Sequence, residues 1–119
     1  MIISLYTETY FKSAHKLENY DGICARLHGH TWKICLWVRG DESLLDKAGI
    51  LWDFNNLDKI TSELDHRYLN EIVDFNPTAE NLSLYIYRKL KDGRADLDFK
   101  IRVYESLIDK KSYCELGDF

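Results

Sequence analysis

Four stretches of the chain show the two-residue period of side chains that is typical of β-strands. They cover residues 2–12, 28–40, 98–106 and 112–116. In the second stretch, the even-numbered residues from Trp32 to Val38 are apolar and share one face, while Cys35 and Trp37 share the other. The first stretch also carries large side chains on both faces, with Ile3, Leu5 and Phe11 opposite Ile2, Tyr6 and Tyr10.

Two segments between the second and third strands have helical spacing instead. Leu57, Ile60 and Leu64 predict an amphipathic helix of roughly three turns, and Asp53 is expected to be its N-cap. The second helix is expected to start with Asn76 as N-cap and Pro77 at its first position, and to end at Gly93. Its buried stripe consists of Leu82, Tyr85, Ile86 and Leu90.

The order of elements is β-β-α-α-β-β, which predicts an α+β fold and a single domain over residues 1–119. A turn is expected at residues 108–111, between the last two strands. Two helices can cover only one face of a four-stranded sheet, and the first two strands carry large side chains on both. Because soluble monomers rarely expose such a patch, the pattern predicts an oligomer.

Composition narrows the function classes. The 119 residues are 45% hydrophobic and 30% charged, with a net charge of −4, and charges of both signs are mixed along the chain. This favours a soluble enzyme over a protein that binds nucleic acid or a membrane surface. The first residues lack a basic region and a long apolar core, so we expect no signal peptide and a cytoplasmic location. Three cysteines do not form a disulfide framework.

A His-Gly-His sequence at the start of the second strand is the first candidate for chemistry. On a strand, His28 and His30 point to the same face. His15 lies upstream and supplies a third imidazole. Catalytic zinc sites typically have three protein ligands and one open position, so these residues predict a zinc site. The alternative is that the histidines are ordinary core or surface residues, since short motifs also occur by chance.

Candidate acid–base groups lie nearby in the sequence or could be brought there by folding. Cys24 precedes the His-Gly-His in a loop and could act as a thiolate nucleophile or base. Asp65 and His66 are adjacent, and at a helix end the carboxylate can orient the imidazole. The alternative for this pair is that it only terminates the helix.

Glu105 continues the apolar face of the third strand, where an unpaired carboxylate would cost on the order of several kcal/mol. It is therefore expected to bind a planar partner with two donors, such as an arginine or an amidine-like edge of a ligand. Alternatively, it lies at the strand end and reaches solvent. Basic residues that could hold an anionic substrate, or be merely solvated, are Lys12, Lys16, Arg26 and Arg67.

Six short blocks occur in a fixed order: FKSAH, CARLHGH, WDFNNL, LDHRYLN, NPTAEN and VYES. Together they resemble the 6-pyruvoyltetrahydropterin synthase / 6-carboxytetrahydropterin synthase family over about residues 3–117. The resemblance implies the tunnelling fold, in which an antiparallel four-stranded sheet carries two helices on one face. In that family, three sheets join into a barrel and two trimers form a homohexamer with active sites between subunits.

The resemblance also implies roles for individual residues. It places Zn²⁺ on the three histidines His15, His28 and His30. It makes Cys24 and the Asp65–His66 pair catalytic. It assigns Glu105 to the 2-amino and ring N–H edge of the pterin, and places Thr78 and Glu80 in a segment that lines the pterin pocket.

Within the family, the short spacing between Cys24 and His28 and the short chain resemble the bacterial 6-carboxytetrahydropterin synthases. The implied enzyme is a zinc-dependent lyase in the route to queuosine. It converts 7,8-dihydroneopterin triphosphate to 6-carboxy-5,6,7,8-tetrahydropterin, acetaldehyde and triphosphate. Two alternatives stay open, a 6-pyruvoyltetrahydropterin synthase and a pterin- or metal-binding protein without turnover. Cys24 argues against a folate branch of the family, which has glutamate at that position.

Overall fold

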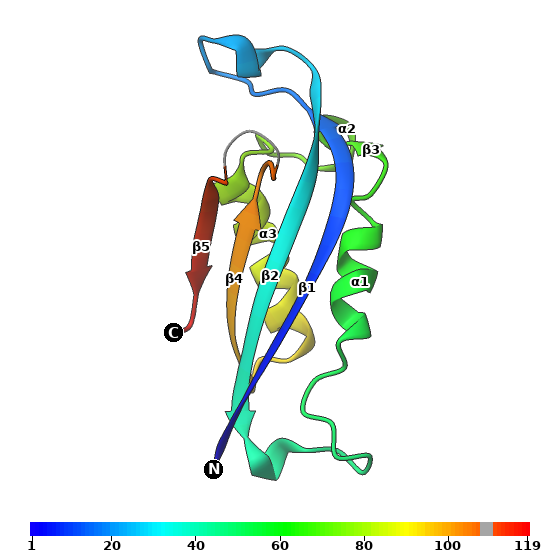
Figure 1. Cartoon of the computed structure of the whole chain (residues 1–119), viewed down its shortest axis with the longest axis vertical. Helices are drawn as coiled ribbons and strands as arrows, with labels where there is room; N and C mark the ends of the chain where they lie inside the picture. The colour runs from blue at the N-terminus through cyan, green and yellow to red at the C-terminus, as the bar shows by residue number, and fades with distance from the viewer. Residues whose placement is uncertain (108–110) are drawn as a thin grey trace.

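The computed structural model describes residues 1–107 and 111–119, so most of the turn predicted at 108–111 lies outside the described residues. The described residues form a five-stranded sheet with α1 and α3 packed against one face (Figure 1). The strands are β1 (Ile2–His15), β2 (His28–Asp41), β3 (Arg67–Tyr68), β4 (Asp98–Tyr104) and β5 (Tyr113–Gly117). The helices are α1 (Asn55–Ser62), α2 (Leu69–Ile72) and α3 (Ala79–Gly93), with short 3₁₀ turns at Ile23–Ala25 and Glu42–Leu44.

The sheet has the order β3-β1-β2-β4-β5. The β1–β2, β2–β4 and β4–β5 pairs are antiparallel, which confirms the α+β class and the four predicted strands. Strand β1 runs three residues further than predicted, and β1 and β2 pair along their whole length, from Ile2 opposite Asp41 to His15 opposite His28. In Figure 1 the connection between these two strands extends beyond the end of the helices.

The sequence did not predict β3 and α2, and β3 makes the sheet mixed because it is parallel to β1. The chain reverses at His66, whose φ of 55° lies in the left-handed region. The backbone N–H of His66 donates to the Lys12 carbonyl, and Arg67 then lies opposite Ser13. Two strand residues and one helical turn are too short to produce a periodic pattern, so neither element is visible in the sequence.

The start of the first helix differs slightly from the prediction. Helix α1 begins at Asn55, with Phe54 rather than Asp53 in the N-cap position, and it has eight residues instead of about three turns. Asp53 still accepts a hydrogen bond from the Asn55 N–H at 2.9 Å. Leu64 is fully buried beyond the end of the helix.

The second helix also starts later than predicted. Thr78, not Asn76, is the N-cap of α3, and its hydroxyl accepts a hydrogen bond from the Asn81 N–H. Asn76 is engaged elsewhere: its side-chain amide accepts from the Glu18 N–H and donates to the Glu18 carbonyl, both at 2.9 Å. The end of α3 at Gly93 agrees with the prediction.

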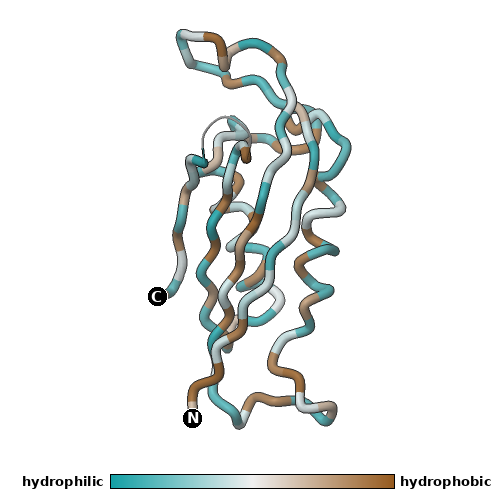
Figure 2. Tube along the Cα trace, viewed as in Figure 1, coloured by the Kyte–Doolittle hydropathy of each residue, from teal (hydrophilic) through white to brown (hydrophobic). Residues whose placement is uncertain are grey.

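The hydrophobic core lies between the helices and the covered face of the sheet. Trp32, Ile34 and Val38 from β2 are fully buried there, and so are the apolar residues of β4, Phe99, Ile101 and Val103. Brown and teal segments alternate along β4 in Figure 2, as expected when one face is buried. The longest helix among the described residues has 15 residues, and none of their helices is long and apolar enough to cross a membrane.

The other face of the sheet, which we call the open face, is less apolar than the prediction assumed. It combines aromatic rings with cations. Arg102 lies over the rings of Trp37 and Tyr113, at 5.3 and 4.1 Å from the centroids. Tyr6 and Tyr10 are exposed at 46% and 51%. Cations stacked on aromatic rings give this face a mixed character, although large aromatic surfaces stay exposed.

Candidate metal centre and active site

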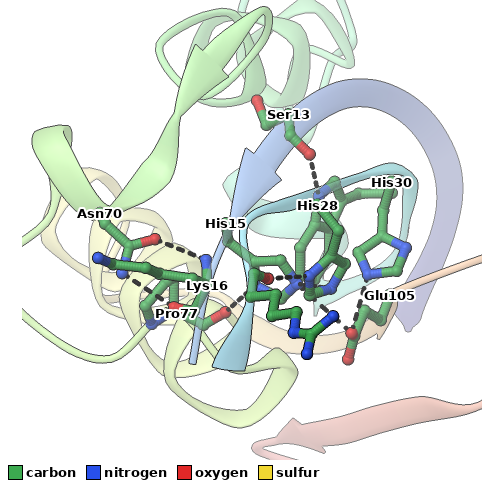
Figure 3. Close-up of polar contacts among 10 residues, drawn as sticks. Ser13, His15, Lys16, His28, His30, Asn70, Pro77 and Glu105 are labelled. Atoms are coloured by element: carbon green, nitrogen blue, oxygen red, sulfur yellow. Dashed lines mark hydrogen bonds and ion pairs between the residues drawn. The ribbon is translucent and has the colours of Figure 1, made fainter. Parts of the chain in front are cut away.

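The three predicted histidine ligands meet where β1 ends and β2 begins. Antiparallel pairing places His15 opposite His28 and Ser13 opposite His30. Because side chains alternate along a strand, His28 and His30 point to the covered face, together with Trp32. Figure 3 shows the three imidazoles converging, with Glu105 beside them. The predicted common face of His28 and His30 is therefore confirmed, and the register adds His15 to it.

Four side chains present one ligand atom each to a common point, and these atoms all lie within 4.8 Å of one another. The Nε2 atoms of His15 and His28 are 3.0 Å apart. The Glu105 Oε1 atom lies 3.1 Å from His30 Nε2 and 3.5 Å from His15 Nε2. Imidazole nitrogens and a carboxylate oxygen are zinc ligands, so this group, which we call the ligand cluster, could hold a metal ion.

Hydrogen bonds of the Nδ1 atoms fix the ring tautomers of two of the histidines. His15 Nδ1 is 2.8 Å from the Pro77 carbonyl, and His28 Nδ1 is 2.6 Å from the Arg26 carbonyl. Since a carbonyl oxygen can only accept, both Nδ1 atoms donate. In the neutral rings, both Nε2 atoms then carry lone pairs that face each other at 3.0 Å. A cation between them removes this conflict.

The third imidazole also fits a metal. The His30 Nε2 atom is buried and has no hydrogen-bond partner among the described residues. Buried polar atoms in native proteins are normally paired, and those that lack a protein partner often bind an ion or a water molecule. Together with the facing Nε2 atoms of His15 and His28, this orphaned atom shows that the donor set suits a metal ion.

Aromatic packing holds the rings of the ligand cluster in place. The Trp32 ring stacks on Phe11 at 5.8 Å and meets the rings of His15 and His30 edge-on at 5.0 and 5.6 Å. His15 is completely buried. The ligand cluster is thus a continuation of the hydrophobic core, and its ring orientations are set by packing.

Glu105 is the member of the ligand cluster that the sequence predicted as a substrate-binding residue and not as a metal ligand. The alternation of β4 does continue to it, because Phe99, Ile101 and Val103 are buried on the same face. Its side chain is 31% exposed, so it is neither fully buried nor free in solvent. When they are protonated, the imidazoles of His15 and His30 hold the pKa of the Glu105 carboxyl well below its usual range. Among the described residues its partners are imidazoles and not an arginine. The other expected partner, an amidine-like edge of a ligand, stays a prediction.

Asp65 and His66 form the predicted pair at the chain reversal after α1. His66 Nδ1 lies 2.7 Å from Asp65 Oδ2, and the other carboxylate oxygen accepts from the Lys12 N–H at 2.8 Å. The hydrogen bond from Lys12, and after it that from His66, lower the pKa of the Asp65 carboxyl. The His66 side chain is 78% exposed. It lines an open hollow of about 670 Å³ that His30 also borders.

The remaining candidates are not part of the ligand cluster. Cys24 lies half-buried in the 3₁₀ turn Ile23–Ala25, and its carbonyl accepts from the Leu17 N–H. Among the described residues, its thiol is not in the group of ligand atoms around the histidines. Thr78 caps α3, and Glu80 is exposed in the first turn of that helix.

Two asparagines contribute to the site in a way that the sequence did not reveal. Asn70 accepts from the Lys16 N–H and donates to the Lys16 carbonyl, at 3.0 and 2.9 Å (Figure 3). Asn76 makes the same pair of bonds with Glu18. They fix the chain that follows His15. Their partners are more than 50 residues away in the sequence, so local patterns give no signal for them.

The fold and the ligand cluster define a class: an α+β protein with a histidine-rich group at one end of its sheet that could hold a metal ion. A family model described as 6-pyruvoyl tetrahydropterin synthase matches residues 4–116. Since this is nearly the whole chain, the protein belongs to that family, as its sequence blocks indicated.

Individual relatives agree with this assignment. The 6-carboxy-5,6,7,8-tetrahydropterin synthase of Bacillus subtilis is 35% identical over 121 residues, covering 92% of this chain and 82% of the relative. The dihydroneopterin monophosphate aldolase of Pyrococcus furiosus is 39% identical over 87 residues, covering 68% of each. The structure of 6-pyruvoyl tetrahydropterin synthase from Caenorhabditis elegans superposes with a TM-score of 0.74 at 25% identity, covering 100% of this chain and 97% of the other. The fold is therefore the tunnelling fold.

Proposed function

We propose that the protein is a zinc-dependent 6-carboxy-5,6,7,8-tetrahydropterin synthase. It converts 7,8-dihydroneopterin triphosphate to 6-carboxy-5,6,7,8-tetrahydropterin, acetaldehyde and triphosphate, as a lyase in the route to queuosine. The observation that carries the proposal is the convergence of the His15, His28 and His30 Nε2 atoms on the covered face of the sheet. The Bacillus subtilis relative, a 6-carboxy-5,6,7,8-tetrahydropterin synthase, supports the choice of reaction.

His15, His28 and His30 would hold the zinc ion through their Nε2 atoms. When bound, zinc supplies a Lewis acid that acidifies the hydroxyl groups of the substrate's side chain. The protein's own contribution is to orient the rings before the metal binds. The Pro77 carbonyl selects the tautomer of His15, and Trp32 packs against two of the three rings.

Cys24 and His66 would move the protons. Cys24, as a thiolate, removes a proton from the substrate's side chain, and His66 transfers a second one. The 2.7 Å contact with Asp65 orients the His66 imidazole and selects its tautomer. The exposure of His66 leaves its outer nitrogen accessible to a substrate.

Glu105, Thr78 and Glu80 would bind the pterin. The ionised Glu105 carboxylate can accept two parallel hydrogen bonds from the 2-amino group and ring N–H of a pterin. Thr78 and Glu80 lie at the start of α3, directly after Pro77, whose carbonyl contacts His15. The helix start is therefore close enough to the ligand cluster to border a shared pocket.

We also propose that the protein is a homohexamer built from two trimers. The half-exposed Tyr6 and Tyr10 on the open face support an interface there. The exposed Asp65–His66 pair is consistent with active sites that are completed between subunits.

The alternative activities that this site could support differ in their products. A 6-pyruvoyltetrahydropterin synthase would release triphosphate without acetaldehyde. The 39% identity to the Pyrococcus furiosus aldolase favours, as a second candidate, cleavage of dihydroneopterin monophosphate. A pterin-binding protein would retain the ligand unchanged.

The test is to incubate the zinc-loaded protein with dihydroneopterin triphosphate, and separately with the monophosphate, and to identify the products by mass spectrometry. Acetaldehyde together with 6-carboxytetrahydropterin is the expected result. A pyruvoyl product, or cleavage of the monophosphate alone, assigns one of the other two activities. Binding without turnover of either substrate contradicts an enzymatic role.

A further inference from the structure

Resting on this proposed function, we infer that Glu105 is a fourth metal ligand before substrate binds and leaves the metal when the pterin arrives. The same carboxylate would then serve two partners in turn. Before substrate binding it closes the metal site, and afterwards it holds the pterin ring. A coordination position on the metal would thereby become free only when the pterin pocket is occupied.

The first argument is distance. Zinc binds imidazole nitrogen and carboxylate oxygen at about 2.0–2.2 Å, and the corners of a tetrahedron of that size are about 3.3–3.6 Å apart. The measured separations are 3.0 Å for His15–His28, 3.1 Å for His30–Glu105 and 3.5 Å for His15–Glu105. All four ligand atoms lie within 4.8 Å of one another. The Glu105 Oε1 atom is therefore close enough to the histidine nitrogens to be the fourth ligand of one metal ion.

The second argument concerns hydrogen bonding. A carboxylate next to neutral imidazoles needs an N–H donor or a cation to face it. His15 Nδ1 already donates to the Pro77 carbonyl, so the His15 Nε2 atom that faces Glu105 is a lone pair when the ring is neutral. His30 Nε2 has no hydrogen-bond partner among the described residues, although Glu105 is 3.1 Å away. Contacts that are short but poorly aligned for hydrogen bonds suit ligands that share a metal ion.

The third argument is that Glu105 is able to move. It is the first residue after β4, which ends at Tyr104, so it lies beyond the paired part of the strand. The pairing of β4 with β2 ends at Tyr104, opposite Lys33. Its side chain is 31% exposed, whereas His15 is completely buried. Of the four ligands, Glu105 can thus be displaced at least cost.

The consequence is a change in coordination during the reaction. Catalytic zinc sites keep one position open, and four protein ligands fill all the positions of a tetrahedral site. If Glu105 fills the fourth position, the substrate must replace it to reach the metal. The pterin ring offers two N–H groups to the displaced carboxylate, which compensates for the lost metal bond.

The first test measures zinc affinity by competition with a chromophoric chelator. Glu105→Gln keeps the shape of the side chain but removes its charge, and we expect zinc to bind at least about 10-fold more weakly than in the wild type, since removal of an outer-shell partner alone costs that much. Glu71→Gln is the matched control, because Glu71 is exposed on α2, and it should bind zinc as the wild type does. Unchanged zinc affinity of Glu105→Gln overturns the inference.

A second test needs no variant. A crystal structure of the zinc-loaded wild type without substrate should show Glu105 oxygen at about 2.0–2.2 Å from zinc. After soaking with 7,8-dihydroneopterin, that distance should lengthen and the carboxylate should contact the pterin ring. A water molecule in the fourth position, with Glu105 away from the metal before soaking, overturns the inference.

His28→Ala separates this inference from the proposed function. If His28→Ala loses zinc and Glu105→Gln does not, the three-histidine site stands and only the role of Glu105 as a ligand fails. If His28→Ala retains wild-type zinc affinity, the metal site itself is wrong, and the proposed function fails with it.

Discussion

The ligand cluster and the Asp65–His66 pair are two groups of ionisable residues that the fold supports in opposite ways. His15 is completely buried, whereas the His66 side chain is 78% exposed. The ligand cluster lies on the longest strand pairing of the sheet and packs against Trp32. The pair lies at a chain reversal beside the two-residue strand β3.

This difference indicates that the two groups have separate functions. The hydrophobic core fixes the positions of the histidines, so a metal meets rings that are already oriented. Within the part of the chain that the structure describes, the Asp65–His66 pair is held by its own hydrogen bond and by two contacts with the Lys12 backbone. We therefore expect replacements in the ligand cluster to affect metal binding and folding, and replacements among the exposed groups to affect turnover, with only a small change in stability.

The largest effect is expected for His15→Ala. It removes a metal ligand, leaves a cavity beside Trp32 and leaves the Pro77 carbonyl without its donor. Zinc affinity should fall by more than about 100-fold, beyond the loss that follows removal of an outer-shell partner, and turnover should disappear. His66→Ala is the comparison and should retain zinc. Chelator competition measures the zinc affinity of both variants, and equal affinities would contradict this separation of functions.

The next largest effect is expected for Cys24→Ala. Loss of a positioned proton-transfer group typically costs about 10²- to 10⁴-fold in rate, while zinc should stay bound because the thiol is outside the ligand cluster. Steady-state kinetics and zinc content of the same preparation check both parts. Cys114→Ala is the control, because Cys114 lies in β5 and should keep wild-type turnover. Loss of zinc from Cys24→Ala would make Cys24 a ligand instead of a base.

The two regions also differ in how well the sequence predicted them. The common face of His28 and His30 follows from the two-residue period of a strand, and this part was correct. The addition of His15 needs the register of β1 against β2, which depends on the whole hairpin. The contacts of Glu105 with the histidines depend on the pairing of β4 with β2, so the sequence could show that Glu105 needs a partner but not which one.

Helix starts were predicted less well, for a related reason. Asn76 is a good N-cap residue in isolation, yet its side chain binds the backbone of Glu18, and Thr78 caps α3 instead. The choice between these two residues depends on a contact across 58 positions of the sequence. Local propensity identifies candidates for a cap, and tertiary contacts select among them.

A smaller effect is expected for Trp32→Phe, which tests whether packing orients the histidines. The smaller ring leaves a cavity against His15 and His30 and should cost about 1–3 kcal/mol of unfolding free energy. Zinc affinity should also fall several-fold, because the rings lose part of their support. Trp37→Phe on the open face is the matched control and should leave zinc affinity unchanged. Urea unfolding and chelator competition measure the two quantities, and equal zinc affinity of both variants would argue against orientation by packing.

The smallest effect is expected for Asp65→Asn, and it should depend on pH. The pKa of the Asp65 carboxyl is lowered in the folded protein by hydrogen bonds from Lys12 and His66. Its ionised form therefore stabilises the fold above its unfolded pKa of about 4, and this stabilisation is lost as the pH falls through the lowered folded-state pKa. Because the carboxylate is 39% exposed, we expect a loss of only about 1 kcal/mol at neutral pH.

Urea unfolding of the wild type and of Asp65→Asn at pH 7 and at about pH 3 measures this contribution. The difference in unfolding free energy should shrink at the lower pH. Asp74→Asn, at an exposed position, is the control and should show little difference at either pH. A difference for Asp65→Asn that stays constant with pH would mean that Asp65 acts through its shape and not through its charge. The carboxylate would then not be the group that orients His66, and the exposed pair would be a structural turn.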